Sequence, residues 1–231
     1  MRLPGLGGWS EDPLWSYVYP WLVEHERIGG IAWRAGTGSD LSLMQETAAV
    51  VGTLPRGARV LDVPTGSGIA LRGLRPGQGI DYVATDISST MLGRARAAAT
   101  RLGVADQVTT TLADVGELPF ADASFDLVVS LTGIHCFPDP RRAIAEMVRV
   151  LAPGARLTGS SLFTDTGPRY EPLRRVGTRA GILGPMCTTV EAVTWMQEAG
   201  CRDVDLTLHG GLGYFHATKQ EAQQETEDDH R

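Results

Sequence analysis

Glycines and carboxylates at the ends of two predicted strands suggest a site for a nucleoside-containing ligand. Gly66 and Gly68 follow the apolar run 60–63, and Asp86 closes the next apolar run, 82–86. At the carboxyl edge of a parallel sheet, such glycines let the backbone approach a ligand, and such an acidic residue accepts hydrogen bonds from ribose hydroxyls. We therefore expect both features at one edge of one sheet.

The residues around these glycines argue against a dinucleotide or a nucleoside triphosphate as the ligand. The dinucleotide pattern requires a third small residue where this chain has Leu71, and no Gly-Lys-Ser/Thr follows the turn. Asp62, at the end of the first run, would repel a pyrophosphate but could receive a cationic amino acid group. S-adenosylmethionine carries an ammonium, a sulfonium and no phosphate, so it fits this arrangement best.

Five segments, in order, resemble motifs of the class I S-adenosylmethionine-dependent methyltransferases. Within that family the chain is most similar to the small-molecule branch related to ubiquinone and menaquinone biosynthesis methyltransferases, closely over about residues 60–163 and loosely elsewhere. One departure is Pro64, which stands where the family usually has a glycine. The segments cover the glycine-rich loop, the ribose-binding strand end, the adenine-binding loop, the fourth strand, and the helix and turn before the fifth: 60–68, 85–92, 113–120, 124–130 and 134–154.

The resemblance implies roles for particular residues in binding S-adenosylmethionine, with S-adenosylhomocysteine as the product. Asp62 is expected to face the methionine ammonium, directly or through water, and Asp86 the ribose hydroxyls. Asp114 is expected to accept from the adenine amino group, with the Val115 N–H donating to the ring. Ile87 and Met91 are expected to flank the adenine. The other expected cofactor contacts are Thr65, Gly66, Ser67, Gly68 and Ser130.

Several of these residues also have a purely structural interpretation. Asp86 and Asp114 could serve as strand-end turn residues or helix caps, because Asp commonly bonds to nearby backbone N–H groups. Ile87 and Met91 could simply pack in the core. The ordered set of motifs favours the cofactor-binding interpretation for both aspartates.

His135 is the predicted catalytic residue, because it follows the fourth strand, where the transferable methyl group should lie. An imidazole there could deprotonate an acceptor hydroxyl as a general base, or it could only line the pocket. We expect the acceptor molecule to be bound by His135 together with Tyr17, Trp33, Tyr170 and Met186. Six of the fifteen aromatic residues lie in the first 33 positions, which suggests an aromatic lid or an amphipathic helix.

The expected reaction is methyl transfer to oxygen, nitrogen or activated carbon of a small, largely apolar acceptor of secondary-metabolite or quinone-like type. The alternative is an S-adenosylmethionine-binding enzyme on the same fold that catalyses a cyclisation or rearrangement without methylation, since fold does not fix function. A binding protein that has lost activity is a third, weaker possibility.

Composition excludes several other classes of protein. The 231 residues are 42% hydrophobic and 21% charged, with a net charge of −6 and no basic stripe; we expect a bacterial protein that does not bind nucleic acid. No apolar run suits a membrane span or a secretory signal, so we expect a cytoplasmic protein, monomeric or homodimeric. The three cysteines have no metal-ligand spacing, so no metal site is expected.

The predicted fold class is α/β: a single-domain, Rossmann-like methyltransferase fold with a seven-stranded, mostly parallel sheet, an antiparallel last strand and helices on both faces. A helix-like segment is expected after the glycine-rich loop, and helices are expected to start at Asp12, Asp139 and Thr188, each with a side-chain cap. The predicted strands are 59–63, 81–86, 107–112, 125–130, 156–163, 203–208 and 213–218.

The predicted organisation has three parts. Residues 1–58 form an N-terminal helical cap or lid, including a glycine-rich loop at 29–40. Residues 59–219 form the cofactor-binding core, in which 164–187, the least regular part, is a substrate-side insertion. Residues 220–231 carry five acidic residues and read as a disordered tail.

Overall fold

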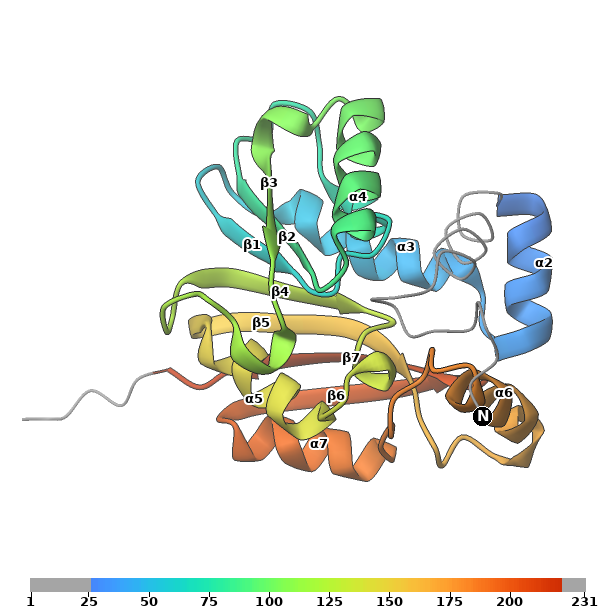
Figure 1. Ribbon diagram of the computed structural model, residues 1–231. Coiled ribbons are helices and arrows are strands. Elements are labelled where there is room, and N and C mark those ends of the chain that lie inside the picture. Colours follow the sequence, from blue (N-terminus) through green and yellow to red (C-terminus); the bar gives the residue numbers. More distant parts are fainter. Residues whose placement is uncertain (1–25, 222–231) are drawn as a thin grey trace, which may run out of the picture.

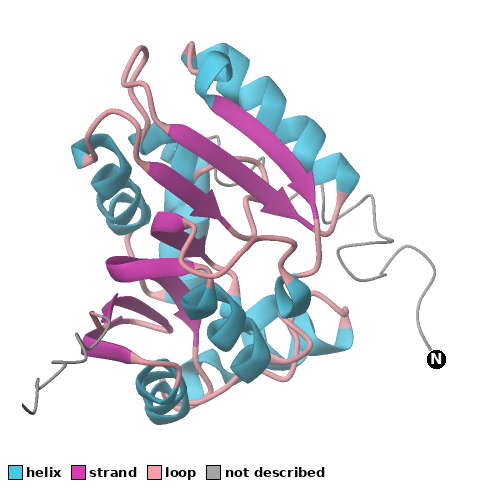
Figure 2. Cartoon of the chain, turned by 90° about the vertical axis from the view of Figure 1, so that its left-hand side faces the viewer, coloured by secondary structure: helices cyan, strands magenta, loops and turns pink. Residues whose placement is uncertain are grey.

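The computed structural model describes residues 26–221, and its centre is one seven-stranded sheet (Figures 1 and 2). The strand order is β3-β2-β1-β4-β5-β7-β6, and β7 runs antiparallel to both of its neighbours while the other pairs are parallel. This confirms the predicted fold class. The strands are β1 Arg59–Asp62, β2 Asp81–Asp86, β3 Val108–Leu112, β4 Phe125–Leu131, β5 Leu151–Leu162, β6 Cys201–His209 and β7 Leu212–Lys219.

The strand order reverses beside β1, and this places the functional edge of the sheet. Asp62, the last residue of β1, is in register with Ala84 of β2 on one side and Val129 of β4 on the other. The chain leaves β1 toward β2 and later returns to add β4 on the opposite side. In open α/β sheets, ligands bind in the crevice outside the carboxyl ends of strands at such a switch point.

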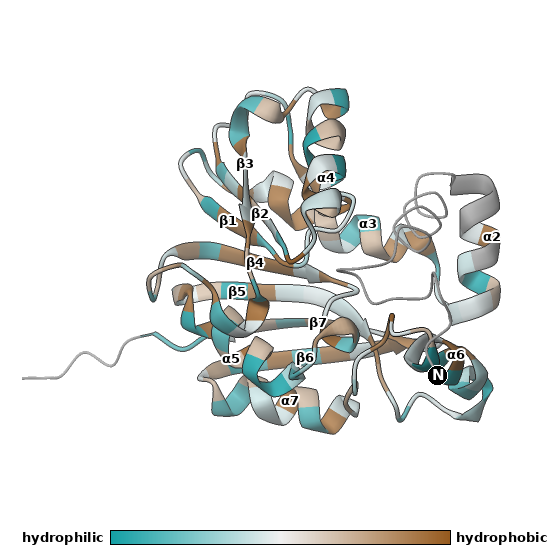
Figure 3. Ribbon diagram, in the orientation of Figure 1, coloured by the Kyte–Doolittle hydropathy of each residue, from teal (hydrophilic) through white to brown (hydrophobic). Residues whose placement is uncertain are grey.

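Helices cover both faces of the sheet and bury two hydrophobic cores. α3 (Leu41–Ala49) and α4 (Ser89–Leu102) cover one face, and α5 (Pro140–Arg149) and α7 (Thr189–Glu198) cover the other. Hydrophobic residues concentrate along the central strands, whereas the helices carry hydrophobic and hydrophilic segments in alternation (Figure 3). Each large apolar side chain fully buried in these cores stabilises the fold by about 1.5–3 kcal/mol.

Local sequence signals set several helix boundaries as predicted. The Asp139 carboxylate accepts the Arg142 N–H at 3.0 Å and caps α5. Thr188 and Glu191 form a complete capping box at the start of α7. Gly103 takes the left-handed conformation that ends α4, with φ 69°, as glycine commonly does at this position.

The predicted glycine-rich loop at 29–40 is wrong, because most of it is helical. α2 spans Glu26–Thr37 and ends where Gly38 adopts φ 71°. Glycine costs about 1 kcal/mol in a helix relative to alanine, which is why the sequence pattern favoured a loop. The helix end is held in place by burial of Thr37, whose hydroxyl donates to the Trp33 carbonyl at 2.8 Å.

Other element predictions also need correction. The segment 164–187, expected to be the least regular part of the chain, contains the helix α6 (Glu171–Arg179), in which Glu171 pairs with Arg174 and Arg175 one turn later. The segment after the glycine-rich loop forms only a short 3₁₀ helix, Ala70–Gly73. β5 starts five residues earlier than predicted, because its first residue, Leu151, pairs with Phe125 of β4.

Some sequence-based expectations fall on residues 1–25 and 222–231, outside the described residues. These include the helix starting at Asp12, the acceptor contact from Tyr17 and most of the acidic tail. Among residues 26–221, no helix combines the length and apolar character needed to cross a membrane. The same residues contain no cluster of His, Cys, Asp and Glu side chains able to hold a metal ion.

Candidate active site

The glycine-rich loop after β1 has one glycine that faces open space and one that packs against the fold. Gly66 adopts φ 52°, and a Cβ added there would meet no atom within 4 Å. Gly68 adopts φ 85°, and its added Cβ would lie 2.7 Å from Leu71 and 3.3 Å from Ala95 of α4. Only the first therefore leaves room for a ligand to approach the backbone.

Asp86 ties this loop to the end of β2. Its Oδ2 accepts the Gly66 N–H and its Oδ1 accepts the Ser88 N–H, both at 2.9 Å. The side chain is buried, and burial raises the pKa of Asp86 while these two N–H groups oppose the rise. Each carboxylate oxygen has a second lone pair, so Asp86 can hold the loop and still accept a hydroxyl from a ligand.

Asp62 lies at the same edge in a closed environment. Its Oδ2 accepts hydroxyl hydrogen bonds from Thr65 at 2.6 Å and from Tyr82 at 2.8 Å. Burial raises the pKa of Asp62 to about 7, and these two hydroxyls oppose the rise. Oδ1 makes no hydrogen bond to the described residues, so one oxygen of a buried carboxylate stays available for a cationic group.

The residues predicted to bind adenine fall into two groups. Ile87 is 53% exposed, and the exposed Asp114 accepts the Gly116 N–H at 2.8 Å and so caps a short turn. Met91 and Val115 are buried, and Val115 belongs to the core on the α5 side. The isoleucine presents an apolar surface at the sheet edge, whereas both buried side chains contribute mainly to packing.

Ser130 and Ser67 are buried, whereas Gly66 faces open space. The Ser130 side chain is fully buried, and its Oγ has no hydrogen-bond partner within residues 26–221. A Cβ added at Gly133 would lie 2.5 Å from both Ser130 Oγ and Pro64 Cδ, so the hydroxyl is enclosed by these residues. Ser67 is also largely buried.

His135 lies in a short 3₁₀ turn, Ile134–Cys136, directly after β4. Its Nδ1 accepts the Leu162 N–H at 3.0 Å and lies 3.1 Å from Ser161 Oγ. The residue is 6% exposed, and burial lowers the pKa of His135 to about 3. Its carbonyl accepts the Gly184 N–H at 2.8 Å, which brings the loop after α6 against this turn.

Two of the predicted acceptor-binding residues lie in one cluster. Trp33 and Met186 pack against the buried side chains of Leu162, Leu183 and Leu212, and Leu162 is the residue whose N–H bonds to the His135 ring. Tyr170 is not part of this cluster. It packs against Gly38 and Gly211, where an added Cβ would collide with its ring or hydroxyl.

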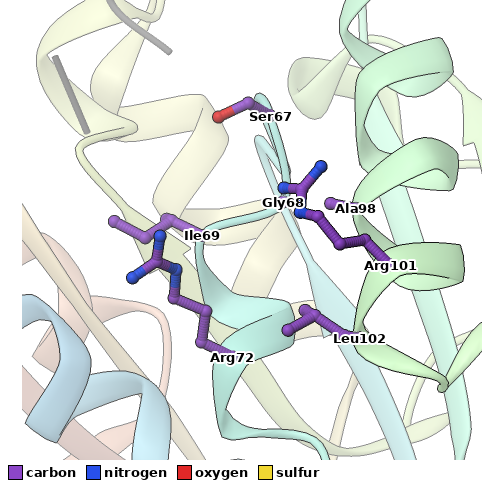
Figure 4. Close-up of a pocket in the computed structure, with 7 residues that line it drawn as sticks. All are labelled: Ser67, Gly68, Ile69, Arg72, Ala98, Arg101 and Leu102. Atoms are coloured by element: carbon purple, nitrogen blue, oxygen red, sulfur yellow. The ribbon is translucent and has the colours of Figure 1, made fainter. Parts of the chain in front are cut away.

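A separate hollow of about 270 Å³ adjoins the glycine-rich loop (Figure 4). Ser67, Gly68 and Ile69 line it, and the side chains of Arg72 and Arg101 approach it from two different elements. None of the three aspartates Asp62, Asp86 and Asp114 lines it, so it is distinct from the carboxylate pair at the strand ends.

Two residues that matter to this site carried no signal in the sequence. Tyr82 reads as an ordinary apolar strand residue, yet its hydroxyl reaches the Asp62 carboxylate from the neighbouring strand. Leu162 reads as a core residue, yet its backbone N–H fixes the His135 ring. Strand register and the placement of β5 beside β4 bring these groups together, so spacing along the chain could not reveal them.

Comparison with known proteins identifies this part of the chain. The sequence from 61 to 158 matches the family model described as a methyltransferase domain. Residues 61–158 form a methyltransferase domain. Within it lie the glycine-rich loop, Asp86, Asp114 and His135. The expectation of a methyltransferase domain is confirmed for these residues.

Two curated methyltransferases align with about half of this chain. The 27-O-demethylrifamycin SV methyltransferase of Amycolatopsis mediterranei is 36% identical over 113 residues, covering 48% of this chain and 42% of that protein. The ubiquinone/menaquinone biosynthesis C-methyltransferase of Psychromonas ingrahamii is 36% identical over 122 residues, covering 52% and 47%. The aligned region thus spans about half the length of these curated relatives.

A solved structure supports the fold over most of the chain. Phosphoethanolamine N-methyltransferase 2 of Haemonchus contortus, in complex with S-adenosyl-L-methionine, superposes with a TM-score of 0.71 over 89% of this chain and 57% of that one. The sequences are only 16% identical, so this likeness establishes the fold and leaves the acceptor to be argued from the site.

Proposed function

We propose that this chain transfers a methyl group from S-adenosylmethionine to oxygen, nitrogen or activated carbon of a small, largely apolar organic molecule. The observation that carries the proposal is the pairing of Gly66, in the loop after β1, with Asp86, at the end of the neighbouring strand β2. The glycine leaves open space on its ligand side, and its N–H is held by the carboxylate that would receive the ribose hydroxyls. The matching methyltransferase domain supports the same cofactor.

The other residues would bind the cofactor in sequence along the sheet edge. Asp62 has a carboxylate oxygen available for the methionine ammonium, and burial strengthens such a charge pair. Ile87 offers an exposed apolar surface for the adenine, with Asp114 at the end of the neighbouring strand. Bound S-adenosylmethionine supplies a methyl group on a sulfonium, and the protein supplies binding, alignment and exclusion of water.

An apolar acceptor is supported by the surroundings of His135. Trp33 and Met186 pack on the cluster that contains Leu162, and this leucine lies beside the imidazole. Ligand pockets are mostly apolar, with a few polar groups that set orientation. The acceptor type also agrees with the curated relatives, which are named for methylation of a rifamycin and of quinone precursors.

The first test is calorimetric titration of the purified chain with S-adenosylmethionine and S-adenosylhomocysteine. We expect binding of both, and a loss of at least about tenfold in affinity for Asp86→Asn, because hydrogen bonds to a charged group are strong. Asp106→Asn is the matched control, since Asp106 is exposed and remote from the β1 and β2 strand ends. If the chain bound neither ligand, the proposal would be refuted.

The second test identifies the reaction. Candidate acceptors are incubated with the chain and S-adenosylmethionine, and the masses of the products are measured by mass spectrometry. Replacement of one hydrogen by a methyl group supports methyl transfer. A converted acceptor of unchanged mass would instead support the alternative, a cyclisation or rearrangement on the same fold.

A further inference from the structure

The hydrogen bond from Leu162 determines where the His135 ring carries its proton. A backbone N–H can only donate and cannot rotate, so Nδ1 must be unprotonated to accept it at 3.0 Å. The Ser161 hydroxyl, 3.1 Å from Nδ1, can rotate, and it also lies 3.0 Å from the Leu162 carbonyl. The neutral ring therefore carries its single proton on Nε2.

This arrangement leaves the imidazole no site at which to accept a second proton. A proton on Nδ1 would point at the Leu162 N–H, and Nε2 is already protonated. Burial works in the same direction, because it lowers the pKa of His135 to about 3. The general-base role expected for this residue would require the Leu162 hydrogen bond to break.

The Nε2 atom is free to bind a ligand. The hydrogen bonds of the ring to residues 26–221 all involve Nδ1, so none of them occupies Nε2. The residue is held at two points: the ring Nδ1 accepts the Leu162 N–H, and the backbone carbonyl of His135 accepts the Gly184 N–H.

We propose that the Nε2–H of His135 donates a hydrogen bond to an anionic oxygen of the acceptor, and that the chain therefore methylates acidic hydroxyls of phenol or enol type. This inference rests on the proposed methyltransferase function and names its substrate class. The hydroxyl of Ser161 lies beside the ring, and a hydroxyl does not take up a proton near neutral pH.

The acceptor hydroxyl must then lose its proton to solvent before methyl transfer. An acidic hydroxyl does so readily, and a hydrogen bond from Nε2–H stabilises the resulting oxyanion in a site of low polarity. The oxyanion electron pair forms the new C–O bond as the C–S bond breaks, and that bond's electron pair stays on sulfur as the neutral thioether. His135 neither gains nor loses a proton.

The first test is a long-range ¹H–¹⁵N spectrum of the histidine rings, with His135 assigned by its loss in His135→Asn. We expect one neutral tautomer, protonated on Nε2, from about pH 5 to about pH 8, where an ordinary histidine titrates. Para-nitrophenol added to the S-adenosylhomocysteine-loaded protein should shift the Nε2–H signal. A proton on Nδ1, a ring that titrates in this range, or an unshifted signal would overturn the proposal.

A matched pair of variants tests the direction of the hydrogen bond. Gln places an N–H donor near the Nε2 position, whereas Asn keeps an acceptor for Leu162 and removes the donor. We expect para-nitrophenolate affinity of the loaded protein to fall about threefold in His135→Gln and more than about tenfold in His135→Asn, as for loss of a hydrogen bond to a charged group. Equal losses would overturn the proposal.

The same titrations separate this inference from the proposed function. S-adenosylhomocysteine binding is measured in each variant before the phenol is added, and circular dichroism checks that each variant is folded. Failure of the wild-type chain to bind S-adenosylhomocysteine would refute the proposed function. Binding of S-adenosylhomocysteine without the expected His135 response would refute only the donor role of His135 and the phenol or enol substrate class.

Discussion

The phenolic hydroxyl of Tyr82 donates to Oδ2 of Asp62 across the β1–β2 pair, at 2.8 Å. Together with the Thr65 hydroxyl it occupies one oxygen of the carboxylate and leaves the other available. A buried carboxylate is costly unless it is hydrogen-bonded. The tyrosine therefore maintains a charge that the proposed function uses to bind the cofactor ammonium.

Tyr82→Phe should weaken cofactor binding in a pH-dependent way. Loss of this donor removes a hydrogen bond that lowers the pKa of Asp62, so more of the carboxyl is protonated at neutral pH. We expect lower S-adenosylhomocysteine affinity at pH 7, recovered in part at higher pH, and a stability loss of about 1–2 kcal/mol. Calorimetry measures the affinity, and urea unfolding measures the stability.

Tyr214→Phe is the matched control for that substitution. Tyr214 bonds to the Ser39 hydroxyl at 2.9 Å, away from the two strand-end aspartates. It should lose stability but keep its affinity for S-adenosylhomocysteine at both pH values. A Tyr82→Phe protein with unchanged affinity at pH 7 would show that the tyrosine does not act through Asp62.

The cofactor-free protein should become less stable as the pH rises toward neutral, through Asp62. Its pKa is 3.8 in an unperturbed chain and about 7 in the fold, so the folded state binds the proton more tightly. The stabilisation is complete below about pH 4 and is lost as the pH rises through 7; over that range it amounts to at most about 4 kcal/mol.

Asp62→Asn isolates this effect, because the amide keeps an oxygen that accepts from Thr65 and Tyr82 and does not titrate. In urea unfolding between about pH 4 and about pH 8, the wild type should lose stability relative to the variant. S-adenosylhomocysteine, which carries an ammonium, should reduce the wild-type loss. Parallel stability curves for the two proteins would contradict the raised pKa.

The contribution of His135 to stability should change with pH in the opposite direction to that of Asp62, because it is lost as the pH falls. Its pKa is 6.5 in an unperturbed chain and about 3 in the fold, so the unfolded state binds the proton more tightly. Its contribution is fully present above about pH 6.5 and is lost as the pH falls toward 3, by about 2 kcal/mol at pH 5. His135→Gln should flatten this acid limb in unfolding experiments.

The exposed His209 provides the control for the acid limb. His209→Gln should leave the pH dependence of unfolding as it is in the wild type. If His135→Gln and the wild type lost stability in parallel between about pH 6.5 and about pH 5, the ring would not be held neutral by the fold.

Alanine substitutions of the two loop glycines should have different consequences. Gly68→Ala combines a positive φ with close approach to Leu71 and Ala95, so it should destabilise the fold by about 2 kcal/mol or more. Gly66→Ala has a positive φ but no clash within the protein, so it should cost about 1 kcal/mol.

Cofactor affinity should respond in the reverse order to these two substitutions. The new methyl group of Gly66→Ala projects into the open space where the ligand would lie, so S-adenosylhomocysteine binding should fall more than the stability loss explains. Folded Gly68→Ala protein should bind nearly as the wild type does. Calorimetry measures binding by both variants below their unfolding temperatures. Wild-type affinity of Gly66→Ala for S-adenosylhomocysteine would contradict the placement of the ligand beside Gly66.

The sequence by itself determined the α/β class, the central strands and the candidate cofactor residues. Short-range patterns carry this information: an apolar run ending in Asp62, glycines at a tight turn, and a second run ending in Asp86. Helix caps at Asp139 and Thr188 are equally local, so they were predictable. The helical state of the 29–40 region was not, because its glycines disfavour a helix and only the wider structure overcomes this.

Tertiary structure alone decided how the site residues act. Tyr82 reaches Asp62 because the register of β1 and β2 places them on one face. The proposed donor role of His135 depends on β5, which presents the Leu162 N–H to its Nδ1. Hydrogen-bond direction and burial depend on groups that are distant in the chain and meet only in the fold, so residue type and spacing could nominate His135 but not its protonation.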